Sequence, residues 1–156
     1  MFKNVVVALD GSPCADHALA LALELAKLAG SKLAICCVAD PAPLYGSLEP
    51  AVLVERTLQA IRSEAQDVVT RALAKAEAAG VSAQGCTPEG EPVYEIGEYA
   101  KKIGADGVVI GTHGRSGVRR LFMGSIAEGV MRHSTVPLIA VREEARIHAS
   151  VAEAVS

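Results

Sequence analysis

The feature that most constrains this chain is a strict alternation between short continuous apolar runs and longer segments with helical spacing. The first run, Val5–Leu9, carries no polar residue at alternate positions. Such a run is typical of a strand covered on both faces, as in a parallel sheet. Parallel neighbours need a long crossover connection, usually a helix, so the alternation predicts an α/β fold with right-handed β-α-β crossovers.

Turn and cap residues divide the chain into five expected strands and four expected helices. Ser12 and Pro13 suit the N-cap and first position of a helix, and Gly30 suits its end. The residues Ala51–Ala79 include no glycine or proline and place apolar residues at steps of three and four, which predicts one long amphipathic helix. The other expected helices are Pro92–Ile103, which contains Gly97, and Ser125–His133. The expected strands are Lys3–Leu9, Leu33–Ala39, Val81–Cys86, Gly107–Ile110 and Val136–Val141.

Composition excludes several classes of function. With 156 residues the chain fits one domain, and its net charge of -3 argues against nucleic acid as a partner. No apolar run approaches the roughly 20 residues of a membrane span, and the first residues show no signal-peptide pattern. The four cysteines form no C-x-x-C pair, which indicates small thiols in a reducing compartment. We therefore expect a cytoplasmic protein.

The segment most informative about function runs from Gly111 to Ser125. Its glycines follow a buried strand and precede a helix, whose N-terminus offers free N–H groups and a positive dipole end to phosphate. Arg115, Arg119 and Arg120 add positive charge. The segment matches neither the P-loop nor the dinucleotide fingerprint. From the residues alone, a phosphate-binding loop and a flexible surface loop with a helix cap both remain open.

The same segment resembles the nucleotide-binding branch of the universal stress protein family, whose signature is G-x2-G-x9-G-[ST]. The signature fits without a gap on Gly111, Gly114, Gly124 and Ser125. The surrounding residues are similar too, in Thr112–Arg115, Gly124–Glu128 and Val136–Val141, and so is the opening Val5–Asp10 followed by Gly11 and Ser12. The resemblance covers Phe2–Arg142, which predicts a domain over residues 1–142 and a tail over 143–156, either a short helix or disordered.

The resemblance implies a three-layer open parallel five-stranded sheet in the order 3-2-1-4-5, Rossmann-like and of the adenine nucleotide alpha hydrolase-like type. In that order the chain reverses between the first and fourth strands. Ligands of open α/β sheets bind at such a switch point, beyond the carboxyl ends of the strands. Asp10 and Gly111 end these two strands, so the residues and the resemblance indicate the same crevice.

The family's ligand roles can be transferred to matching positions of this chain. The resemblance implies ATP, or ADP or AMP, with Mg²⁺ or Mn²⁺ at the phosphates. Asp10 matches the acidic residue near the ribose and the metal, although an Asx turn leading into Ser12 would also explain it. Val38 matches a residue whose backbone contacts adenine. Ala8 and Leu9 would line the adenine pocket, and the ribose and phosphates would be surrounded by Gly111, His113, Gly114, Arg115, Gly124, Ser125 and Ile126.

The expected function is therefore that of an ATP-binding universal stress protein, a small regulatory protein that holds ATP with little turnover. We find no Walker lysine, no second carboxylate cluster and no evident base facing the phosphates, and we assign no catalytic residue. His113 could be an ordinary loop histidine, and Arg119 and Arg120 a solvated face. The alternatives are a slow ATPase and an interaction module that works without nucleotide.

Self-association is the last expectation. In the 3-2-1-4-5 order the strand Val136–Val141 lies at an edge, and its apolar sequence carries no lysine that would prevent pairing. Pairing of the same edge from two chains gives a closed dimer, and the resemblance implies the same antiparallel homodimer. The alternative is that the tail Glu143–Ser156 covers this edge and leaves a monomer.

Overall fold

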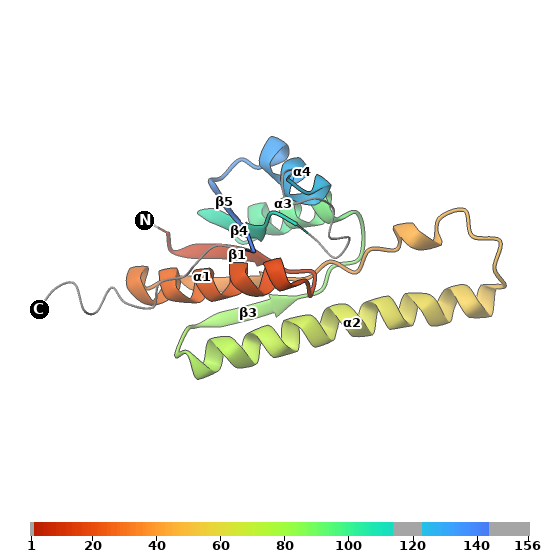
Figure 1. The fold of residues 1–156 in the computed structure, drawn as a ribbon, viewed down its shortest axis with the longest axis horizontal. Coiled ribbons are helices and arrows are strands. Elements are labelled where there is room, and N and C mark those ends of the chain that lie inside the picture. The colour runs from red at the N-terminus through yellow and green to blue at the C-terminus, as the bar shows by residue number, and fades with distance from the viewer. Residues whose placement is uncertain (1, 114–122, 144–156) are drawn as a thin grey trace, which may run out of the picture.

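A computed structural model of the chain describes residues 2–113 and 123–143 and shows a three-layer α/β fold (Figure 1). All strand pairs are parallel, and the sheet has the order β3-β2-β1-β4-β5. This confirms the expected fold class and strand order. In chain order the elements are β1 (Asn4–Ala8), α1 (Pro13–Ala29), β2 (Lys32–Cys36), η1 (Ala42–Leu44), α2 (Ala51–Ala78), β3 (Ala83–Cys86), α3 (Pro92–Lys102), β4 (Gly107–Gly111), α4 (Ser125–His133) and β5 (Leu138–Val141).

The sheet is covered on both faces by hydrophobic layers. Side chains alternate along each strand, so Val7 and Ile35 pack toward α1 and α2, whereas Val6 and Cys36 pack toward α3 and α4. Each of these four side chains is at most 1% exposed. The face of α1 that meets the sheet is rich in buried alanine, which lets the helix lie close to the strands (Figure 1).

Local signals of the sequence position the first helix as expected. The Ser12 hydroxyl accepts a hydrogen bond from the Ala15 backbone N–H at 3.2 Å, which caps the N-terminus of α1. Gly30 follows the helix with φ 67°, a left-handed conformation that glycine adopts without a Cβ penalty. Gly97 does not interrupt α3, which is continuous through that position.

Four of the five strands are shorter than the apolar runs that predicted them, and β4 extends one residue further, to Gly111. β2 ends at Cys36, yet the chain goes on beside the end of β3, with the Ala39 N–H bonded to the Pro88 carbonyl at 2.8 Å. β5 begins at Leu138, two residues later than expected, because Pro137 has no N–H to give to a ladder. The Pro137 carbonyl still accepts from the Val108 N–H at 2.9 Å.

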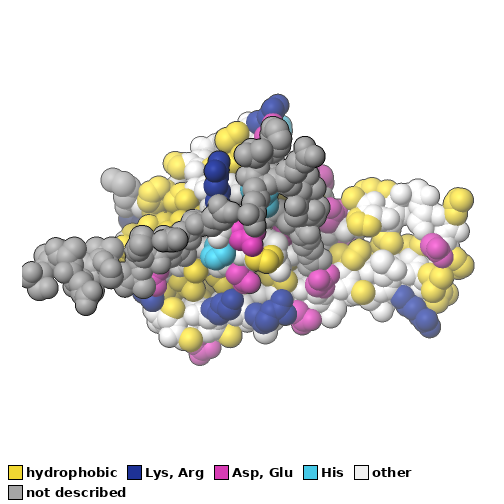
Figure 2. All heavy atoms as spheres, in the orientation of Figure 1, with side chains coloured by type: hydrophobic (Ala, Val, Ile, Leu, Met, Phe, Trp, Pro, Cys, Tyr) yellow, Lys and Arg dark blue, Asp and Glu magenta, His cyan; other side chains and the backbone are white. Residues whose placement is uncertain are grey.

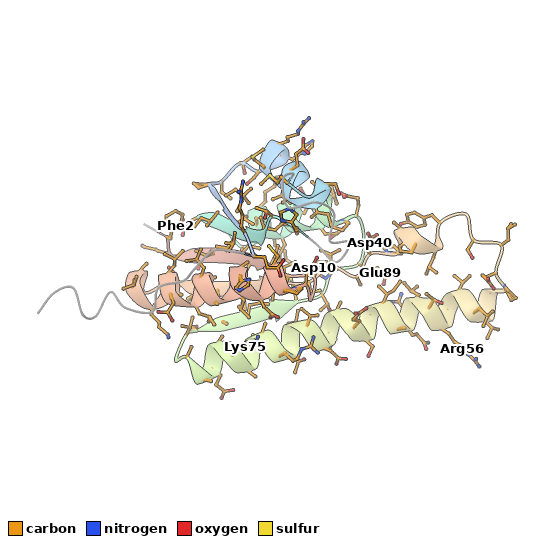
Figure 3. The ribbon with its side chains drawn as sticks, viewed as in Figure 1. Phe2, Asp10, Asp40, Arg56, Lys75 and Glu89 are labelled. Atoms are coloured by element: carbon orange, nitrogen blue, oxygen red, sulfur yellow. The ribbon has the colours of Figure 1, made fainter. Side chains whose placement is uncertain are left out.

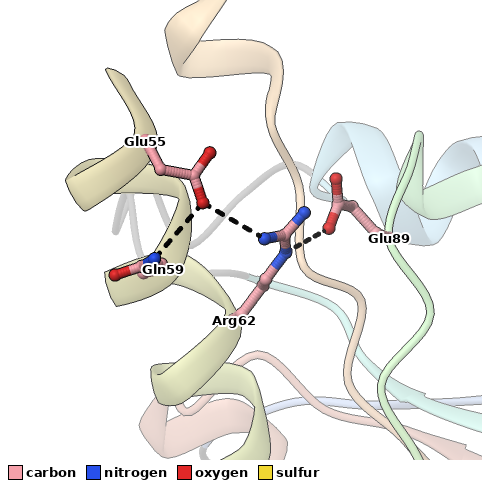
Figure 4. Close-up of polar contacts among 4 residues, drawn as sticks. All are labelled: Glu55, Gln59, Arg62 and Glu89. Carbon is pink, nitrogen blue, oxygen red and sulfur yellow. Dashed lines mark hydrogen bonds and ion pairs between the residues drawn. The ribbon is translucent and has the colours of Figure 1, made fainter. Parts of the chain in front are cut away.

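The first half of α2 extends past the body of the protein (Figure 1). All its buried residues lie from Ala65 onward, and Ile61 is the partly buried residue before that point that packs against the core. Hydrophobic side chains gather on this extension, and Leu48 in the preceding loop is fully exposed (Figure 2). Arg62 stabilises the position of the helix, because its side chain bonds Glu89 at 2.6 Å and lies 3.8 Å from Glu55 (Figure 4).

Within residues 2–113 and 123–143, every helix is too short or too polar to cross a membrane.

Candidate functional site

A cavity of about 580 Å³ opens at the carboxyl ends of β1 and β4, where the strand order reverses. Its size is in the usual range for small-molecule sites, roughly 300–1,000 Å³. Asp10, after β1, and Asp40, after β2, lie at this end of the sheet, whereas Phe2 lies at the opposite end (Figure 3). The parallel arrangement therefore brings loops that are distant in the sequence to one place.

Nine of the eleven residues that the sequence singles out line this one cavity. Gly114 and Arg115 lie outside the described residues, as do Arg119 and Arg120. The nine come from the ends of three strands and the start of one helix: Ala8, Leu9, Asp10, Val38, Gly111, His113, Gly124, Ser125 and Ile126.

Asp10 has a local structural role in addition to its place in the cavity wall. Its carboxylate Oδ1 accepts a hydrogen bond from the Ser12 backbone N–H at 2.9 Å, as in an Asx turn. The turn and the Ser12 cap hold the start of α1 beside the end of β1. The Ser12 hydroxyl also reaches the His113 carbonyl at 3.5 Å, which is a long contact between the two loops of the switch point. Asp10 therefore forms an Asx turn and also lines the cavity.

Thr112 holds together the two described ends of the glycine-rich segment. Its carbonyl accepts from the Gly124 N–H at 2.6 Å, and its own N–H bonds the Val141 carbonyl at 2.8 Å. Its hydroxyl lies 2.9 Å from Nδ1 of His113. Because Gly124 directly precedes α4, these bonds position the N-terminus of that helix at the end of β4.

The cavity wall offers hydrogen-bond donors that suit an anion. Gly124 is the N-cap of α4 and has no side chain to bond the first N–H groups of the helix, which begins with Ser125 and Ile126. Within the described part of the chain, Nε2 of His113 is buried without a hydrogen-bond partner. A helix N-terminus and an unsatisfied ring nitrogen beside one cavity fit a phosphate group.

Several residues that line the cavity do not follow from the sequence reasoning. Asp40 follows an apolar run and carried a usable signal, since polar residues after a buried strand lie at the ligand end of a parallel sheet. Glu64 comes from α2, and no local pattern relates that helix to the glycine-rich segment. The other unpredicted lining residues are Ala15, Cys36, Cys37, Pro43, Ile61, Ala65, Pro92, Ile96, Ile110, Thr112 and Ala127.

A second hollow of about 670 Å³ lies between α3 and α4, near the start of β4 and the approach to β5. None of the nine described site residues lines it. Its walls are mainly helical side chains such as Val93 and Val130, and it lies away from the switch point. The cavity at the switch point is therefore the candidate site.

Comparison with known proteins agrees with this fold. Universal stress protein YxiE of Bacillus subtilis is 32% identical over 148 residues, which cover 91% of this chain and the whole of the relative. A crystal structure of a universal stress protein family member from Burkholderia pseudomallei is 33% identical, with a TM-score of 0.70 and coverage of 89% of this chain and 95% of the other. A universal stress protein solved in complex with cAMP is 30% identical, with a TM-score of 0.61 and coverage of 91% and 98%.

The match to the family as a whole is equally extensive. The family model described as the universal stress protein family matches residues 1–142. The strand order, the cavity at the switch point and the similar relatives are consistent with that match. The chain belongs to the universal stress protein family.

Proposed function

We propose that this protein binds an adenine nucleotide in the switch-point cavity, with ATP and Mg²⁺ or Mn²⁺ as the physiological ligands, and that it acts as a regulatory protein of the cytoplasm that turns ATP over little. The observation that carries the proposal is the convergence of nine signature and pocket residues on one cavity. The 30% identical relative solved with cAMP supports an adenine nucleotide as the class of ligand.

The proposed pose follows from the chemistry of the cavity wall. The adenine would lie against Ala8 and Leu9 and contact the backbone of Val38, because this part of the wall is apolar. The ribose would lie near Asp10. The phosphates would meet the N-terminus of α4 at Ser125, where the helix dipole favours negative charge.

The metal is proposed to arrive with the nucleotide. Within residues 2–113 and 123–143, no group of three His, Cys, Asp or Glu side chains is arranged to hold a metal ion. Phosphate oxygens together with Asp10, directly or through water, would provide oxygen ligands of the kind that Mg²⁺ prefers. The protein's own part is then to bind and orient the nucleotide.

Calorimetry with the purified full chain tests this proposal. We expect a saturable binding heat with millimolar ATP and Mg²⁺, and release of adenine nucleotide when the purified protein is denatured and extracted. Turnover in the same incubation should be far below the usual enzyme range of roughly 1–10³ s⁻¹. Absence of both heat and extractable nucleotide would refute binding, and sustained turnover near one per second would favour an ATPase.

We also propose a homodimer formed by the edge strand β5. The direction of the backbone groups alternates along a strand. The Pro137 carbonyl accepts from Val108 of β4, and the Val141 carbonyl accepts from Thr112, the residue after β4. Leu138 and Ala140 therefore direct their N–H and C=O groups away from the sheet. Such an edge of unpaired groups is a template for a second strand. The residues 144–156, which would cover this edge in the alternative monomer, lie outside the described part of the chain.

Replacing Ala140 by proline is expected to convert the dimer to a monomer without unfolding it. Ala140 is exposed on β5, and proline there removes an outward N–H while leaving the bonds to β4 intact. Light scattering coupled to size exclusion at tens of micromolar should show a dimer mass for the parent chain and a monomer mass for the variant. A control, Ala140→Val, keeps the N–H and should remain dimeric. A monomer mass for the parent chain would refute the dimer.

A further inference from the structure

Two cysteine thiols meet across the neighbouring strands β2 and β3. Cys36 and Cys86 are register partners in the parallel ladder, and both side chains pack on the face that α3 and α4 cover. The two thiols are therefore side-by-side neighbours on one face of the sheet. Cys36 is 1% exposed, whereas Cys86 is half-buried on the edge strand β3.

The surroundings make the two thiols chemically different. Interaction with Cys36, together with Tyr99 and the charge of Lys102, lowers the pKa of the Cys86 thiol against the opposing effect of burial. The pKa of Cys36 is raised, first by its interaction with Cys86 and then by burial. Cys86 is thus the thiolate-forming member of the pair, and Cys36 is the neutral thiol beside it.

The Tyr99 side chain packs in the same cluster as the two thiols. Burial and the charge of Cys86 raise the pKa of Tyr99 to about 12, so the phenol stays protonated. The other charged group that acts on the pair is Glu95 of α3, and its charge affects the pKa of Cys36 and not that of Cys86. Cys86 is the less buried of the two thiols and the one with the lowered pKa, so a reagent from solvent would react with it first.

We propose that Cys86 and Cys36 form a peroxide-reactive dithiol that is converted reversibly into a disulfide between β3 and β2. Neighbouring strands are about 4.8 Å apart, and the Cα atoms of disulfides are separated by about 4.4–6.8 Å. Two paired cysteines on the same face of neighbouring strands therefore meet the distance requirement. The inference does not depend on nucleotide binding.

The chemistry is balanced with one hydroperoxide as the oxidant. The Cys86 thiolate attacks an oxygen of the peroxide, so that an S–O bond forms, the O–O bond breaks, and the leaving oxygen takes a proton to become water or an alcohol. Cys36 then attacks the sulfur of Cys86, an S–S bond forms, and the hydroxyl leaves with the Cys36 proton as water. Two thiols and one peroxide give one disulfide, and an added thiol reductant reverses the oxidation.

The other two cysteines provide internal controls, because neither faces this pair. Cys37 follows Cys36 directly but packs on the opposite face of the sheet, toward α1 and α2. Cys14 lies on α1, where its thiol donates to the Val141 carbonyl at 3.0 Å. Both are buried, at 3% and 2% exposure, so neither can substitute for Cys86.

Peptide mass spectrometry of the full chain after a short exposure to hydrogen peroxide tests the proposal. We expect one linked peptide pair, Cys36 with Cys86, which disappears on treatment with dithiothreitol. The variant Cys86→Ala should give no linked pair, and Cys37→Ala should give the same pair as the parent chain. In Cys36→Ala, Cys86 should proceed to sulfinic acid, because no resolving thiol remains.

Alkylation of Cys86 at different pH values provides a second readout on the unaltered chain. The thiolate fraction rises with pH through the pKa, so the rate should level off at a pH below the ordinary value of 9.0. A rate that still rises at pH 9, or a disulfide between other cysteines, or overoxidation of Cys86 in the parent chain without a disulfide, would overturn the proposal.

Discussion

Replacing Ser125 by aspartate is expected to abolish nucleotide binding while the protein remains folded. Ser125 is exposed and is the first residue of α4, at the wall of the switch-point cavity. Two unit charges about 4 Å apart repel by about 4 kcal/mol at an effective dielectric constant of about 20. Solvent screening reduces this value at an exposed position, so we expect the Kd for ATP with Mg²⁺ to rise by at least about 100-fold.

The same aspartate should not weaken the fold. A negative charge in the first turn of a helix interacts favourably with the helix dipole, by about 0.3–1 kcal/mol. The melting temperature of Ser125→Asp without nucleotide should therefore equal or slightly exceed that of the parent chain. A loss of binding together with an unchanged melting curve is a result that damage to the fold cannot produce.

Two control variants separate charge at the cavity from other effects. Ser125→Ala removes the hydroxyl without adding charge and should weaken binding only modestly. Ala51→Asp places the same charge at the first position of α2, which is exposed and is not part of the cavity wall, and should leave binding unchanged. If Ser125→Asp binds ATP as tightly as the parent chain, the phosphates do not lie at the start of α4, and the proposed pose is wrong.

The sequence predicts the sheet and the first helix well because their signals are local. The run Val5–Leu9 has to be covered on both faces. Ser12, Pro13 and Gly30 each favour one position at a helix end, namely the N-cap, the first helical residue and the C-cap. The strand order needed more than local signals. It came from the resemblance carried by the spacing of Gly111, Gly124 and Ser125, because nothing in a strand's own residues tells which neighbour it pairs with.

The features that sequence reasoning missed depend on where elements meet in space. The periodic apolar residues of α2 continue before Ala65, but periodicity does not tell where the body of the protein ends, and that half of the helix extends beyond it. Glu64 lines the cavity for the same reason: its place depends on how α2 packs on β3. The pairing of Cys36 with Cys86 depends on strand register, which the sequence does not reveal for two residues with 49 others between them.

The contact between β3 and α2 leads to the second large effect, a loss of stability in Gly85→Ala. A Cβ at Gly85 would overlap Cγ1 of Val69 and come within 3.1 Å of Cδ1 of Leu73. Val69 is 2% exposed, and a β-branched side chain in a helix has one strongly preferred rotamer, so it cannot turn away. Either the strand or the helix must shift, and overpacking of this kind costs about 1–3 kcal/mol.

A glycine-to-alanine substitution in the next element, α3, should change the free energy of unfolding in the opposite direction. The comparison of the two variants is therefore decisive. Gly97 lies inside α3, and a Cβ built there meets no atom within 4 Å. Gly97→Ala should stabilise the protein by about 0.5–1 kcal/mol, because alanine loses less backbone entropy in a helix than glycine does. Urea unfolding of both variants measures the two changes in the free energy of unfolding. Equal effects in the two variants would mean that the close approach of α2 to β3 does not exist in solution, since only that contact distinguishes the two glycines sterically.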